Sequence, residues 1–151
     1  MPETPITSKA GQEGIISACL KSARQYGKEG LHEQAIDMLK AASNLEPDNT
    51  EVLITMAAAY YEIERYGDAL QLLQRAHHLD PSEPNAVAGL GDVFVMTGKW
   101  DDAIEQMETL YQLDNCRALN LFKTVFASFN NHLLERLIQA GNRYHARQFS
   151  D

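Results

Sequence analysis

The stretch that decides the fold runs from residue 50 to residue 83 and reads TEVLITMAAAYYEIERYGDALQLLQRAHHLDPSE. Its first half carries apolar residues three and four positions apart, at Leu53, Met56, Ala57 and Tyr60. This spacing places them on one face of an α-helix. The second half carries a similar face and ends before Pro81, because proline cannot continue a helix. The stretch therefore predicts two helices that are joined by a short turn.

The pattern recurs with a period of 34 residues along the chain. The columns hold aromatic residues at Tyr26, Tyr60 and Phe94, alanines at Ala35, Ala69 and Ala103, and small residues at Ala23, Ala57 and Gly91. Because so many columns share one spacing, the sequence predicts three units, over residues 16–49, 50–83 and 84–117. A single helical hairpin cannot bury both of its apolar faces, so we expect the units to stack into an all-α solenoid.

The turn inside each unit is expected to contain a glycine. The candidates are Gly30, Gly67 and Gly98, which lie between the two apolar faces of their units. Glycine populates backbone conformations with positive φ at little steric cost, and a tight turn between two helices needs such a residue.

Both ends of the chain depart from the repeat. Residues 1–14 contain two prolines and two glycines and no apolar core, so we expect a flexible N-terminal tail. After residue 117, an apolar stripe predicts another helix, and Asn130-Asn131 predicts a turn before a further helix from His132 to His145. Residues 118–148 are therefore interpreted as a degenerate fourth hairpin. It either caps the solenoid or leaves Phe122, Phe126 and Phe129 exposed for self-association or for a partner.

The composition limits the classes of partner. The formal net charge of −8 argues against nucleic acid, because phosphate binding needs clustered Lys and Arg. No apolar run approaches the roughly 20 residues that span a bilayer, so we expect no membrane insertion and a cytoplasmic location. Cys19 and Cys116 form neither a metal motif nor a disulfide framework.

The charge is unevenly distributed along the chain. Residues 1–116 carry 8 basic and 19 acidic groups, for a net charge of −11, whereas residues 117–151 carry 5 basic and 2 acidic groups, for a net charge of +3. An acidic body with a basic end favours basic partners or contact between two copies, and it also simply favours solubility.

The 34-residue helix-turn-helix unit, with its columns of small, aromatic and Ala residues and a closing Pro, resembles the tetratricopeptide repeat (TPR) family. The third unit departs from the family pattern at Leu110 and Asn115. The resemblance implies a non-catalytic protein that holds another protein and needs no cofactor. In size and acidity the chain is also similar, more weakly, to the small TPR chaperones of bacterial type III secretion.

In this family the first helix of each hairpin lines the concave side of the array. The resemblance therefore implies a partner-binding groove made of Leu20, Arg24, Ile54, Ala58, Tyr61, Ala88, Asp92, Val95 and Met96. Apolar residues with a few charges suit an extended or helical peptide segment. Among the positions at which TPR co-chaperones grip a carboxyl terminus, only Arg24 is a plausible cation, so such a clamp is not evident.

The first hypothesis is thus a TPR adaptor or chaperone that binds a peptide segment of a partner protein in its groove. The alternative is a structural assembly subunit that self-associates through its C-terminal helices. No catalytic motif supports an enzyme, and His77-His78 is a poor metal pair because adjacent residues point to different helical faces. The fold indicates this class of function and not the identity of the partner.

Overall fold

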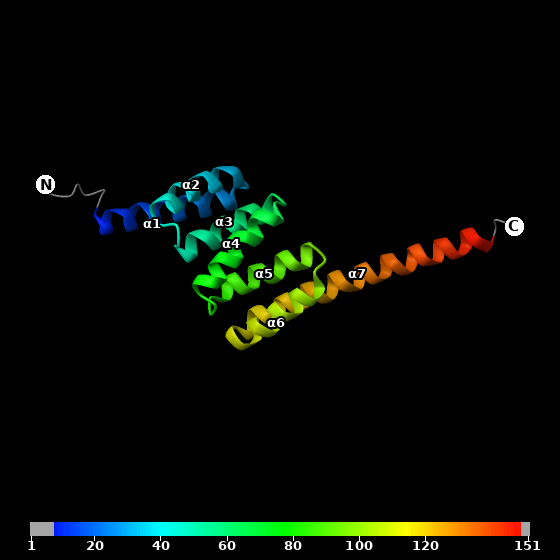
Figure 1. The fold of residues 1–151 in the computed structure, drawn as a ribbon. Coiled ribbons are helices and arrows are strands. Elements are labelled where there is room, and N and C mark those ends of the chain that lie inside the picture. The colour runs from blue at the N-terminus through cyan, green and yellow to red at the C-terminus, as the bar shows by residue number, and fades with distance from the viewer. Residues whose placement is uncertain (1–7, 149–151) are drawn as a thin grey trace.

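The structure, a computed structural model, describes residues 8–148 of the chain. This part contains seven α-helices: α1 (Lys9–Lys28), α2 (His32–Leu45), α3 (Thr50–Glu62), α4 (Tyr66–Leu79), α5 (Pro84–Met96), α6 (Trp100–Leu113) and α7 (Asn115–Gln148). The first six form three hairpins that stack in chain order (Figure 1). The predicted all-α fold of three repeats is therefore confirmed.

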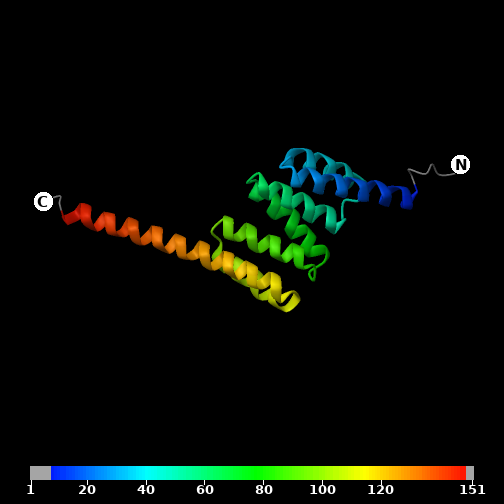
Figure 2. The same cartoon turned by 180° about the vertical axis from the view of Figure 1, so that it is seen from behind.

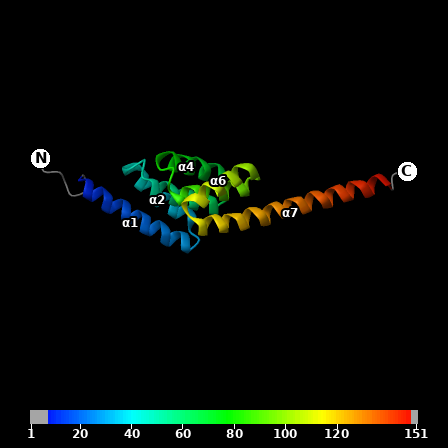
Figure 3. The same ribbon diagram turned by 90° about the horizontal axis from the view of Figure 1, so that it is seen from below.

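The helices are arranged in two layers. Helices α2, α4 and α6 lie on one side of the molecule, and α1 and α7 lie on the other (Figure 3). Each first helix contacts the first helix of the next hairpin, from α1 to α3 to α5, and α7 packs against both α5 and α6. Beyond these contacts, α7 continues past the stack, so the start of α1 and the end of α7 lie at opposite ends of the molecule (Figure 2).

The repeat columns build the core. Alanines Ala35, Ala69 and Ala103 are fully or almost fully buried, as is Ala57. Gly91 belongs to the same column of small residues as Ala57. A Cβ on Gly91 would lie 2.4 Å from a methyl group of Leu121 on α7. Small residues are therefore needed where neighbouring helices approach closely.

The turns within the hairpins confirm two of the three predicted glycines. Gly30 and Gly98 have φ of 74° and 72°, and the third residue with positive φ among residues 8–148 is Glu64, at 60°. These three residues are 34 positions apart. The prediction for Gly67 is wrong, because Gly67 lies inside α4. The position in the hairpin therefore determines which residue adopts the left-handed backbone conformation, whatever the type of that residue.

The N-terminal tail is shorter than predicted. Helix α1 begins at Lys9, and the Ser8 hydroxyl accepts a hydrogen bond of 3.2 Å from the backbone N–H of Gly11. A serine at this position caps the free N–H groups of the first turn. The predicted flexibility is therefore wrong for residues 9–14, and residues 1–7 of the predicted tail lie outside the described residues.

The predicted C-terminal helix pair is also wrong. Helix α7 runs without interruption from Asn115 to Gln148, through Asn130 and Asn131. An asparagine in a helix interior costs only a fraction of a kcal/mol, and no proline interrupts the segment. None of the helices in the described part of the chain is both long enough and apolar enough to cross a bilayer.

Candidate functional site

The face formed by the first helices of the three hairpins is hollowed. Four repeat columns lie on this face, and we call them together the groove. They are Ser17, Glu51 and Asn85; Lys21, Thr55 and Gly89; Arg24, Ala58 and Asp92; and Lys28, Glu62 and Met96. Within a helix these residues are three or four positions apart, so they share one side of it. Each is exposed or half-buried.

Two equivalent hollows lie in the groove, one repeat apart. The first lies between α1 and α3, has a volume of about 590 Å³ and is lined by Arg24, Thr55 and Ala58. The second lies between α3 and α5, has a volume of about 340 Å³ and is lined by Ala58, Gly89 and Asp92 at matching positions. Because Ala58 borders both hollows, they form a continuous depression across the three helices.

The structure places most of the predicted groove residues on this face. Arg24, Ile54, Ala58, Tyr61, Ala88 and Asp92 line its hollows, and Met96 is 50% exposed at the end of its column. Leu20 and Val95 are different, because only 6% and 4% of their surfaces are exposed. Both pack into the core between helices, so their prediction as open groove positions is wrong.

Sequence reasoning missed several groove residues that the 34-residue step could have identified. They include Thr55 and Gly89. Each is one repeat away from, or one helical turn from, a residue that was predicted. Gly89 has no side chain because a Cβ there would lie 2.7 Å from a Leu73 methyl group. The hollow between α3 and α5 thus reaches down to Leu73.

Asp92 is the polar centre of the hollow between α3 and α5. The walls around it are mostly apolar, with Ile54, Ala88 and Val93 among them. In the described part of the chain, its carboxylate makes no hydrogen bond and no ion pair. Burial raises the pKa of Asp92 above its ordinary value of 3.8, because an apolar surrounding disfavours the charged form.

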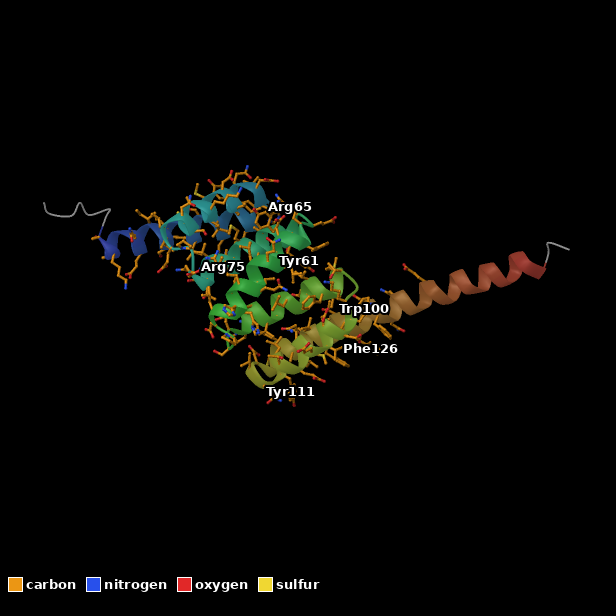
Figure 4. All side chains as sticks on the ribbon, in the orientation of Figure 1. Tyr61, Arg65, Arg75, Trp100, Tyr111 and Phe126 are labelled. Atoms are coloured by element: carbon orange, nitrogen blue, oxygen red, sulfur yellow. The ribbon has the colours of Figure 1, made fainter. Side chains whose placement is uncertain are left out.

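Tyr61, which is labelled in Figure 4, lines the same hollow from α3. Its ring packs edge-on against Tyr66, with 5.5 Å between the ring centroids. Burial, and then the negative charge of Asp92, raise the pKa of the Tyr61 hydroxyl. The hydroxyl therefore stays protonated at neutral pH and offers a hydrogen-bond donor and acceptor beside an aromatic face.

The charge of the groove changes sign from α1 to α5. Helix α1 contributes Lys21, Arg24 and Lys28, and Arg24 forms an exposed ion pair with Glu51 of α3. On α5 the charged residue of the groove is Asp92. The hollow at Asp92 is thus the part of the groove in which a positive group would be favoured.

A second exposed surface lies on α7, apart from the groove. The side chains of Phe122, Phe126 and Phe129 are 48%, 62% and 48% exposed. Phe122 stacks on Phe126 at 6.2 Å, and Phe129 meets Trp100 edge-on at 6.0 Å. Trp100 and Phe126 lie where α7 leaves the stack (Figure 4). Among the described residues, no three His, Cys, Asp or Glu side chains come together as a metal site would require.

Solved structures share this architecture. The first TPR domain of human RPAP3 superposes with a TM-score of 0.72 at 19% identity, covering 78% of this chain and 94% of that domain. The second TPR domain of human RPAP3, solved with the HSP70 peptide SGPTIEEVD, gives 0.70 at 24% identity and covers 76% and 98%. The second TPR of Spaghetti (RPAP3), bound to the HSP90 peptide SRMEEVD, gives 0.64 at 26% identity and covers 68% and 97%.

Comparison with curated proteins finds no match to the chain. The profile of the tetratricopeptide repeat matches residues 28–74 and 64–115, which together span more than half of the sequence. These two matches run from the end of α1 to the start of α7 and so cover helices α2 to α6. The chain therefore belongs to the tetratricopeptide repeat family.

Proposed function

We propose that the protein is a protein-interaction module that holds a segment of a partner protein in the groove, as an adaptor or chaperone does. The observation that carries this proposal is the hollow between α3 and α5, with its apolar walls and its unpaired carboxylate. Ala58, Ala88 and Gly89 leave room for a ligand side chain, and Tyr61 supplies a rigid aromatic surface of the kind common at binding hot spots.

Asp92 indicates the chemistry of that ligand. A carboxylate in a partly apolar site is stabilised when a cation or another strong donor reaches it. A Lys or Arg side chain of the partner would supply this donor, and its methylene stem would lie along Ile54 and Tyr61. We therefore infer that the bound segment combines apolar residues with at least one basic residue.

The second TPR domains of human RPAP3 and of Spaghetti (RPAP3) bind peptides that end in EEVD. These peptides carry acidic side chains. Such a peptide would bring negative charge to Asp92, and like charges repel in a partly desolvated site. Acidic C-terminal peptides are consequently expected to be poor ligands for the hollow between α3 and α5.

The proposal is tested with a library of random twelve-residue peptides displayed on phage, selected on the immobilised protein. Selected sequences are expected to be enriched in Lys or Arg next to apolar residues. Synthetic copies are then titrated by fluorescence anisotropy against the wild type and against Ala58→Arg, which fills both hollows. A matched control is Ala41→Arg, which adds the same side chain at an exposed position on α2, outside the groove.

Binding should survive Ala41→Arg and be lost in Ala58→Arg. Asp92→Asn should weaken the basic peptides about tenfold or more, since a hydrogen bond to a charged group is worth about 1.5–3 kcal/mol. The peptide SRMEEVD serves as the acidic comparison. The proposal would be refuted if no peptide is selected above background, or if Ala58→Arg binds as tightly as the control.

A further inference from the structure

Helix α7 enters the stack differently from α3 and α5. Four residues connect α2 to α3, and four connect α4 to α5, whereas Asp114 alone connects α6 to α7. The Asp114 carboxylate accepts hydrogen bonds from the backbone N–H groups of Cys116 and Arg117, at 3.0 and 3.1 Å, and so caps the new helix at once. The start of α7 is therefore displaced from the repeat.

The displacement turns α7 about its own axis. On α3 and α5 the equivalent residues Met56 and Leu90 are buried, but 34 positions after Leu90 stands Thr124, which is exposed. The next residue, Val125, is buried instead. A shift of one residue corresponds to a rotation of about 100°. Consequently, a residue of α7 takes the place of the α5 residue that lies 35 positions earlier in the chain, and not 34 positions earlier.

This rotation explains the exposed apolar row on α7. Counted at 35 residues, the row takes the positions of Pro84, Val87, Gly91 and Phe94 on α5. It consists of Leu119, Phe122, Phe126 and Phe129, which are 48–62% exposed. On α5, Val87, Gly91 and Phe94 are buried, and Gly91 meets Leu121 of α7. The row thus faces the place where the next helices would pack. In the described part of the chain α7 packs against α5 and α6, and at the end of the row Phe129 meets Trp100 of α6 edge-on.

Phe126 argues against a helix of the same chain as the missing neighbour. In the other first helices this position holds Ala57 and Gly91, where helices approach closely. A phenylalanine there leaves too little room for another helix to approach as closely as α7 approaches Gly91. The row instead follows the alternating spacing of three and four residues that forms a seam between two long helices. Leu133 continues this spacing in the sequence.

We propose that this row is a homodimer interface in which α7 of a second copy packs antiparallel along α7. Charge complementarity selects this occupant. Residues 117–151 carry a net charge of +3, from 5 basic and 2 acidic groups, whereas residues 1–116 carry −11. Helix α6, which packs against α7, exposes acidic residues at Asp101, Asp102, Glu105 and Glu108.

The antiparallel orientation follows from the same charges. It brings the basic C-terminal half of one α7 beside the acidic α6 of the other copy, whereas a parallel pair would place the two basic halves together. Glu108 lies at the edge of this contact, because it lines a hollow of about 490 Å³ together with Tyr111, Leu119 and Phe122.

The exposed area is of the right size for a specific contact. Tyr111 and the four residues of the row each expose roughly 100 Å², given the size of aromatic side chains. Two copies would thus bury about 1,000 Å² from these residues alone, before the rest of α7 is counted. Specific interfaces begin at about 1,200 Å². On a monomer, an apolar patch of roughly 500 Å² is already among the largest found.

The test measures the mass of the full chain by sedimentation equilibrium and by light scattering after gel filtration, over a hundredfold range of concentration. The wild type is expected to be a dimer. Phe126→Asp is expected to be a monomer, since it places a charge in the middle of the row. Its matched control is Thr124→Asp, which adds the same charge at an exposed position outside the row and should remain a dimer. Circular dichroism confirms that both variants are helical.

A second variant tests the charge argument without altering the row. Glu105→Lys combined with Glu108→Lys should weaken dimerisation at least tenfold, and high salt should weaken the wild type. Ala58→Arg in the groove should leave the dimer intact. The dimer proposal and the groove proposal are therefore tested independently, and either can be refuted without the other. A wild type that is monomeric throughout, or a dimer that persists in Phe126→Asp, overturns the interface. A dimer indifferent to the charge reversal overturns the antiparallel arrangement.

Discussion

Glu64 occupies the left-handed position that glycine occupies in the other two hairpins. Its φ is 60°, against 74° for Gly30 and 72° for Gly98. A Cβ at Gly30 or Gly98 would meet no atom within 4 Å, so the strain at this position comes from the backbone conformation and not from crowding by neighbours. We therefore predict that Glu64→Gly stabilises the protein.

The magnitude follows from two opposing effects. The left-handed conformation costs a residue with a Cβ about 1–2 kcal/mol. Glycine loses more conformational entropy on folding, which offsets about 0.5–1 kcal/mol of the gain. The net stabilisation is expected to be about 0.5–1 kcal/mol, and for a chain of this size it raises the Tm by roughly 1–4 °C. The same reasoning predicts that Gly98→Ala costs about 1 kcal/mol.

The assay is equilibrium unfolding in urea, followed by circular dichroism at constant protein concentration. Glu105→Gly is the matched control, because it makes the same chemical change at an exposed position in the middle of α6. There glycine should destabilise the helix by about 1 kcal/mol. The two Glu→Gly variants should thus move in opposite directions. If Glu64→Gly destabilises as much as Glu105→Gly does, the strain assigned to this turn is absent.

Two further predictions concern the glycines of the first helices and the carboxylate of the groove. Gly27→Ala should stabilise the protein by about 0.5–1 kcal/mol, because Gly27 is helical and a Cβ there would meet nothing within 4 Å. Gly91→Ala should destabilise the protein by about 1–2 kcal/mol, because a Cβ there would overlap Leu121. Thermal unfolding of both variants checks this contrast. Asp92→Asn should stabilise the protein at neutral pH. The folded-state pKa of Asp92 is raised, so ionisation opposes folding above that pKa, and the penalty vanishes below the ordinary value of 3.8. The stabilisation should therefore shrink as the pH falls toward 4, and a stabilisation that is constant over pH 4–7 contradicts the burial of this charge.

The repeat columns were predictable because they record contacts that recur. Ala35, Ala69 and Ala103 are buried in the structure at equivalent places, and each allows the same close approach of two helices. Glu64 was not predictable in this way. The strain at Glu64 arises from the geometry of the hairpin. The glycine in the sequence that predicted the turn, Gly67, lies inside α4 instead.

The groove was predictable only in part. Ala58 and Asp92 could be placed on the open face, since the family resemblance implies that the first helices line the concave side and the 34-residue step relates both residues to Arg24. Leu20 and Val95 could not be separated from them, because a helix that contacts three neighbours buries residues on both margins of its open face. Burial at those margins depends on how closely adjacent hairpins approach, and the sequence alone does not encode this distance.

The width of the apolar surface on α7 carries the remaining argument. Its inner stripe of Ala118, Leu121 and Val125 is buried against α5 and α6. The outer row from Leu119 to Phe129 extends the apolar surface to about half the circumference of the helix, at 100° per residue. A helix that packs against a core on one side needs an apolar stripe of only about 100°. The 34-residue step could not reveal the difference, because both stripes have helical spacing. Their combined width nevertheless indicates that α7 has a further neighbour besides α5 and α6, on the side of the outer row.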